Sequence, residues 1–114
     1  MISVFANGGN LVFPSLVEKL VDAQGNTVSN ETMGEPTRII SKETADTIRG
    51  FMESVVSNGT GIYAKPENMG AGGKTASTQT GIYDENGEEI VHAWFAGFFP
   101  EETPKYTVVV LKEG

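Results

Sequence analysis

At 114 residues the chain has the length of one domain and is too short for two of ordinary size. Its composition, 39% apolar and 20% charged, is that of a globular protein and not of a disordered tail. The net charge of −7 argues against nucleic acid or an anionic membrane as a partner, and the lack of cysteine excludes disulfides, thiol catalysis and zinc–thiolate sites. No apolar run approaches the roughly 20 residues of a membrane-spanning helix.

The first 36 residues predict short elements joined by turns. Residues 1–6 are apolar and run into Asn-Gly-Gly-Asn, which predicts the end of a helix stopped by glycine. A small hairpin should follow around the turn at residues 22–26, where Gly25 suits the left-handed conformation. We expect extended segments at residues 11–13 and 16–21 before this turn, the other arm of the hairpin at 27–28, and a loop at 30–36.

Residues 41–57 carry the clearest helical pattern. Ser41 can cap the helix, and Glu43 in the first turn is favourable to the helix dipole. The third residue after the cap is Thr44 and not glutamate, so the full capping box is not met. Six apolar residues fall at helical spacing on one face: Ala45, Ile48, Phe51, Met52, Val55 and Val56.

The C-terminal half predicts a three-stranded antiparallel meander. A long glycine-bearing connection at residues 59–72 leads into a polar strand within residues 70–81. The turn at 84–87 ends in Asn-Gly, a strong hairpin signal because both positions favour φ > 0. The runs at 90–99 and 106–111 are apolar on both faces, so we expect the middle strand to be covered on both sides.

The polar strand, GAGGKTASTQTG, is the stretch best supplied with chemistry. Glycines run into Lys74, which is followed by hydroxyl and amide side chains, on what should be an outer strand beside an open groove. A phosphate-binding loop would need glycine where Asn68 stands and a helix after Thr75, and the chain has neither. A lysine in a strand usually faces solvent and has no function. Lys74 lies between glycines and hydroxyl side chains and not among other charges, which favours a functional role for it.

Four ordered blocks of the chain resemble the C-terminal part of the transpeptidase domain of class B penicillin-binding proteins. They are residues 5–9 (FANGG), 57–61 (SNGTG), 73–81 (GKTASTQTG) and 92–100 (HAWFAGFFP). Together they span nearly the whole chain, with 73–81 matching the Lys-Thr-Gly strand of the penicillin-recognising enzymes. In that family glycines let the strand approach the substrate closely. One departure is that the third signature position is Ala76, whose methyl group narrows the approach to the strand.

The resemblance implies roles for the residues of this strand. Lys74 would join the active-site hydrogen-bond network and attract the substrate's terminal carboxylate. Thr75 and Ser77 share one strand face and would grip that carboxylate, although threonine also simply suits a strand. The backbone N–H of Ser77 would complete the oxyanion hole. The substrate-binding set is Lys74, Thr75, Ala76, Ser77 and Gln79.

The chain lacks the family's other two motifs. The nucleophile requires S-x-x-K, but Ser15 and Lys19 are one residue too far apart, and no S-x-N stretch fits either. Both motifs lie upstream in the family, so we expect residues 1–114 to be a fragment that carries one wall of the site. No metal or other cofactor is implied, because the single histidine, His92, lacks the neighbours of a metal site and should pack or pair at a strand start.

The resulting interpretation is an α+β fragment: a three-stranded antiparallel meander, one main packed helix and a small N-terminal hairpin. Its parent would be a D,D-transpeptidase at the extracytoplasmic face of the membrane, anchored by a segment upstream of Met1. It would act on peptidoglycan stem peptides and be acylated by β-lactams. Two alternatives stay open: a non-catalytic binding or structural module, and a β-lactam sensor or hydrolase of the same superfamily. One helix can cover only one face of the sheet, which leaves Trp94 or Phe95 exposed on the other. We therefore expect the isolated chain to self-associate through the apolar edge at 106–111 or through that face, or else to rearrange its N-terminal segment to cover them.

Overall fold

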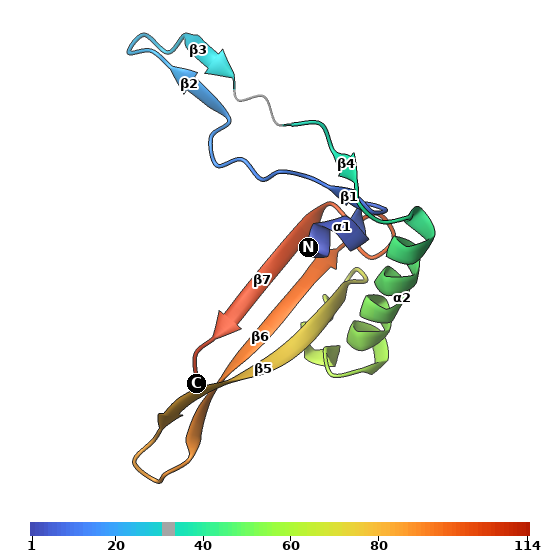
Figure 1. Ribbon diagram of the computed structural model, residues 1–114, viewed down its shortest axis with the longest axis vertical. Helices are drawn as coiled ribbons and strands as arrows, with labels where there is room; N and C mark the ends of the chain where they lie inside the picture. Colours follow the sequence, from blue (N-terminus) through green and yellow to red (C-terminus); the bar gives the residue numbers. More distant parts are fainter. Residues whose placement is uncertain (31–33) are drawn as a thin grey trace.

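The C-terminal half of the chain folds into one antiparallel sheet, as the alternation of apolar runs and turn residues predicts (Figure 1). The structure is a computed structural model that describes residues 1–30 and 34–114. The sheet has the strand order β5-β6-β7, and the predicted α+β meander with one main helix is confirmed. The elements are α1 (Ile2–Ala6), β1 (Asn10–Leu11), β2 (Lys19–Val21), β3 (Thr27–Asn30), β4 (Thr37–Arg38), α2 (Lys42–Asn58), the 3₁₀ helix η1 (Ile62–Ala64), β5 (Gly72–Tyr83), β6 (Glu89–Phe99) and β7 (Tyr106–Lys112).

Helix α2 begins where its cap predicts. The Ser41 Oγ accepts a hydrogen bond from the Thr44 backbone N–H at 3.0 Å and donates to the Thr44 hydroxyl at 2.8 Å, so threonine partly fills the place of the missing glutamate. Of the predicted apolar face, Ala45, Met52 and Val56 are buried. Phe51 is 67% exposed, which the helical spacing did not predict, because it lines an open hollow between α2, α1 and β5.

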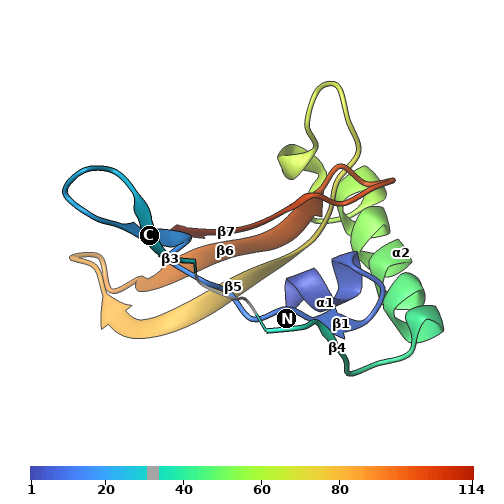
Figure 2. The same ribbon diagram turned by 90° about the horizontal axis from the view of Figure 1, so that it is seen from above.

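Helices and loops lie against both faces of the sheet near one end (Figure 2). Helix α1 lies on one face, while η1 and the loop after it lie on the other, and α2 runs along the β5 side. Phe98 of β6 is 1% exposed and forms the centre of the small core. The described residues include no helix long and apolar enough to cross a membrane.

The expected covering of both faces of β6 is wrong for the outer half of that strand. Trp94 is 37% exposed, and Val91 is also exposed. The β5–β6 hairpin extends beyond the reach of α1 and α2, so its far end has no layer on either face (Figure 1). Burial therefore follows the length of the strands and not only their apolar pattern.

Both hairpin turns use an aspartate to order the backbone. The Asp84 Oδ1 accepts from the backbone N–H groups of Asn86 and Glu88, each at 2.9 Å, and only Gly87 of this turn has positive φ. The expectation that Asn86 also takes φ > 0 is therefore wrong, because the aspartate holds the turn in a longer form. The turn after Asp22 repeats these contacts, and Gly25 has the predicted positive φ of 87°.

The N-terminal hairpin formed by β2 and β3 is present as predicted and projects away from the sheet (Figure 1). A second small pair, β1 with β4, was not predicted, because each strand has only two residues. The Arg38 guanidinium ties this pair to the end of α1 by donating to the carbonyl of Gly8 at 2.8 Å. The predicted loop at 30–36 includes residues 31–33, which lie outside the described residues.

Candidate functional site

The polar strand β5 lies at an edge of the sheet, as the sequence predicted. Its central residues pair with small or apolar partners on β6, with Lys74 opposite Ala96, Thr75 opposite Phe95 and Ser77 opposite Ala93. Because side chains alternate along a strand, Thr75 and Ser77 lie on one face and Lys74 on the other. The strand edge thus brings a cation and two hydroxyls within one short segment.

Lys74 is exposed, and its Nζ donates a hydrogen bond to the backbone carbonyl of Thr75. The ammonium therefore bends from its own strand face toward the edge of β5. Next to its stem lies an apolar hollow of about 350 Å³, lined by Gly73, Lys74 and residues of α1 and α2. The exposed Lys74 side chain thus lies between this hollow and the edge of β5.

Thr75 is half-buried on the opposite face and has a partner that the sequence did not single out. Its Oγ1 lies 2.7 Å from the Oγ1 of Thr60, in the loop after α2. Ser77 is exposed on the same face two residues on, so both hydroxyls point to one side of the strand. The only sign of Thr60 in the sequence was its place in the SNGTG block.

Ala76 and Gln79, the other two predicted substrate-binding residues, do not share the environment of Thr75. Ala76 is exposed on the Lys74 face opposite Trp94, so its methyl group does not lie between the hydroxyls of Thr75 and Ser77. The Gln79 amide donates to the carboxylate of Glu89 at 2.8 Å. The other oxygen of that carboxylate accepts from the backbone N–H of Gly81 at 2.9 Å, where the register of β5 and β6 shifts.

The glycines before Lys74 are required by the packing of the protein itself. A Cβ added at Gly72 would lie 2.3 Å from the ring of Phe98, and one at Gly73 would lie 2.3 Å from the ring of Phe95. These distances are far shorter than any van der Waals contact. Two aromatic rings of β6, on opposite faces of the sheet, therefore lie against the backbone of β5, and only glycine leaves room for them.

His92 behaves as the sequence predicted. It is half-buried near the start of β6, and its Nδ1 accepts from the backbone N–H of Gly114 at 3.4 Å. Among residues 1–30 and 34–114 no cluster of histidine and carboxylate side chains could hold a metal ion.

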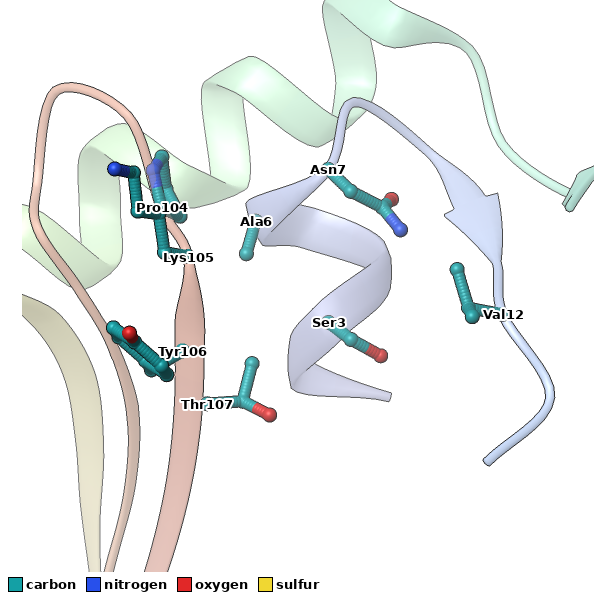
Figure 3. Close-up of a pocket in the computed structure, with 8 residues that line it drawn as sticks. All are labelled: Ser3, Ala6, Asn7, Val12, Pro104, Lys105, Tyr106 and Thr107. Atoms are coloured by element: carbon teal, nitrogen blue, oxygen red, sulfur yellow. The ribbon is translucent and has the colours of Figure 1, made fainter. Parts of the chain in front are cut away.

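A second hollow, of about 230 Å³, lies between α1, the segment after β1 and the start of β7 (Figure 3). Ser3 of α1 and Asn7, the residue after α1, line one side, and Lys105 and Thr107 line the other. Lys74, Thr75 and Ser77 do not line it. This hollow is therefore separate from the hydroxyl-bearing edge of β5, which is the candidate site that the sequence predicts.

The sequence model of the family described as "Penicillin binding protein transpeptidase domain" matches residues 1–114. The chain belongs to the penicillin-binding protein transpeptidase family. It is 35% identical over 113 residues to stage V sporulation protein D of Bacillus subtilis, and 31% identical over 125 residues to penicillin-binding protein PbpB of Mycolicibacterium smegmatis. These alignments cover 96% and 99% of this chain but only 17% and 19% of the two relatives.

Solved structures show the same partial match to the penicillin-binding fold. The D,D-transpeptidase domain of a peptidoglycan glycosyltransferase from Eggerthella lenta superposes with a TM-score of 0.82 at 28% identity, covering 98% of this chain and 25% of that one. Penicillin-binding protein A of M. tuberculosis, solved as an imipenem acyl-enzyme complex, also gives a TM-score of 0.82, at 24% identity, and covers 98% of this chain and 24% of that one. The transpeptidase segment thus has the architecture of one part of a larger domain.

Proposed function

We propose that residues 1–114 are the C-terminal part of a D,D-transpeptidase domain that cross-links peptidoglycan stem peptides and is acylated by β-lactams. The observation that carries this proposal is the edge strand β5, which presents Lys74 together with the hydroxyls of Thr75 and Ser77, in a chain of this family. A serine outside this segment would attack the peptide carbonyl, expel the terminal amino acid and form an acyl-serine. An amine of a second stem peptide would then take the acyl group and release the serine.

In this proposal the β5 residues hold and polarise the substrate. The Lys74 ammonium attracts the terminal carboxylate and joins the hydrogen-bond network around the nucleophile, and the hydroxyls of Thr75 and Ser77 donate to the carboxylate oxygens. The Ser77 backbone N–H points at the oxyanion of the tetrahedral intermediate. Ala76 and Gln79 complete the wall beside the substrate, and the reaction requires no cofactor.

The proposed substrate also sets the place of action. Peptidoglycan is assembled outside the cytoplasm, so the parent protein would work at the extracytoplasmic face of the membrane. An anchoring segment would then belong to a part of the parent outside residues 1–114.

Intact-protein mass spectrometry with benzylpenicillin tests the proposal. The full-length protein that carries this segment should gain one acyl group, on a serine outside residues 1–114. The isolated chain should gain none, because it has no S-x-x-K nucleophile. A stoichiometric adduct on any serine of residues 1–114 would contradict the assignment, and rapid release of the acyl group by water would favour a hydrolase over a transpeptidase.

A further inference from the structure

We propose that Thr60 is a positioning residue that orients the Thr75 hydroxyl toward a carboxylate bound at the edge of β5. This inference rests on the proposed function and extends it to a residue outside the signature strand. It starts from the contact between the two hydroxyl oxygens, 2.7 Å apart and 15 residues apart in the chain. That distance is the usual length of an O–H···O hydrogen bond.

The chain reaches this contact through a tight turn at the end of α2. The backbone N–H groups of Gly59 and Gly61 both donate to the carbonyl of Val55, at 3.1 and 3.0 Å. A Cβ at Gly59 would lie 3.0 Å from the Val55 Cα and carbonyl oxygen, and one at Gly61 would lie 3.1 Å from the Val55 Cγ1. The two glycines therefore let the backbone fold closely over the last helical turn, which places Thr60 against β5.

The chemistry of hydroxyl groups gives this contact a direction when an anion is bound. A threonine hydroxyl has one proton to donate and two lone pairs that accept. A carboxylate accepts only, so Thr75 must donate its proton to the anion and can then only accept from Thr60. The resulting chain runs from Thr60 to Thr75 to the carboxylate, and each bond polarises the next.

Without the Thr60 hydroxyl, nothing fixes the Thr75 hydroxyl as a donor to the carboxylate. The Thr75 side chain would no longer be held in one rotamer, and its proton could turn toward water or a backbone carbonyl. Ser77, two residues along the same face, is exposed and has no such partner among the described residues. The geometry thus makes Thr75 the fixed donor of the pair and Ser77 the adaptable one.

The test compares two probes in the full-length protein that carries this segment. Benzylpenicillin has a free carboxylate, and its methyl ester lacks the charge. Thr60→Val, which keeps the shape and removes the hydroxyl, should slow acylation by the acid by about three- to tenfold, the effect expected for one hydrogen bond between neutral groups. Acylation by the ester should slow less, because its neutral carbonyl is a weaker acceptor than a carboxylate. Thr60→Ser should restore the wild-type rate with the acid.

A matched control is Thr47→Val, because the Thr47 hydroxyl bonds to the carbonyl of Glu43 within α2, at 2.9 Å. It should leave both rates unchanged. Equal slowing of acid and ester by Thr60→Val, or slowing of neither, would overturn the positioning role. If Thr60→Val does not fold, Thr60→Ala must show the same selective loss with the acid. A wild-type protein that reacts with neither probe would overturn the proposed function itself, and this role with it.

Discussion

Lys74 and Thr75 are neighbours whose side chains leave opposite faces of β5, yet the lysine ammonium reaches the threonine carbonyl. This is possible because β5 is an edge strand, so the lysine can bend around a side that carries no further strand of the described sheet. On an inner strand the same side chain would meet a neighbouring backbone. The edge position thus brings a cation and two hydroxyls together within one short segment.

At the residue scale, Lys74→Ala in the full-length protein should slow acylation by benzylpenicillin on the order of 10²-fold, the loss typical of one electrostatic contact at a transition state. The melting temperature should barely change, because Lys74 is exposed and loses little packing. Stopped-flow acylation and calorimetry measure the two quantities. Lys112→Ala, at an exposed position of β7, is the control and should alter neither. Parallel losses of activity and stability would make Lys74 a structural residue.

At the element scale, the packing of β5 against β6 depends on aromatic rings of β6 that lie against glycines of β5. Gly72→Ala should destabilise the protein by about 1–3 kcal/mol, because the new methyl group and the ring of Phe98 would occupy the same space. Adding Phe98→Leu should recover part of this loss by making room for the methyl group. Urea denaturation of the three variants measures it. If the double variant is less stable than both single variants, the clash is not the cause.

The aspartates in the two hairpin turns should make the stability of these turns depend on pH. Backbone hydrogen bonds from Glu88 and Asn86 lower the pKa of Asp84 below its ordinary value of 3.8. A lowered folded-state pKa means that the carboxylate contributes stability above that ordinary value and loses it as the pH falls through the lower, folded value. The amide of Glu88 should therefore lose hydrogen-exchange protection below about pH 3.8.

Asp84→Asn keeps an oxygen acceptor at this turn but cannot titrate. In that variant the protection of Glu88 should no longer change with acid, while the turn after Asp22 should still respond, because a side-chain bond from Asn26 lowers the pKa of Asp22 in the same way. An unchanged acid response at Glu88 in the variant would exclude Asp84 as its origin.

The elements show which features a sequence can predict. Helix α2 and strand β5 were predictable because caps, turns and periodicity are local properties of the chain. The form of the 84–87 turn was not, because the Asp84 side chain overrides the usual preference of Asn-Gly. The Thr60–Thr75 contact joins residues 15 apart through a turn whose shape depends on glycine packing against Val55, so no local pattern reveals it.

At the scale of the whole molecule, the chain has more surface than its length predicts. Its accessible surface is 8467 Å², whereas a compact monomer of this size exposes about 6,100 Å². Its radius of gyration is 18.5 Å, against about 13 Å for a compact domain of 114 residues. Phe51 and Trp94 contribute to this surface: Phe51 lines an open hollow between α2, α1 and β5, and Trp94 is exposed on β6.

This excess of surface, together with its many exposed apolar side chains, predicts that the isolated chain self-associates. Strand β7 is an outer strand of the described sheet, and its Val109 and Val110 are exposed. The free edge of β7 is therefore suited to pair with a strand of a second chain. The hairpin of β2 and β3 projects away from this edge and does not cover it (Figure 1). Light scattering coupled to size exclusion at micromolar concentration should detect a dimer or larger species, with slow amide exchange at residues 108–110.

Val109→Lys should shift this equilibrium to monomer, because a charged side chain on an edge strand opposes pairing between chains. A monomeric wild-type chain whose amides at 108–110 still exchange slowly would mean that the N-terminal segment has moved to cover the edge. A monomer with those amides unprotected and Trp94 exposed would contradict both outcomes. If the rest of the transpeptidase domain already covers β7, Val109→Lys should leave the oligomeric state of the full-length protein unchanged. Comparing the isolated chain with the full-length protein therefore shows whether the β7 edge is free in the parent domain or already paired there.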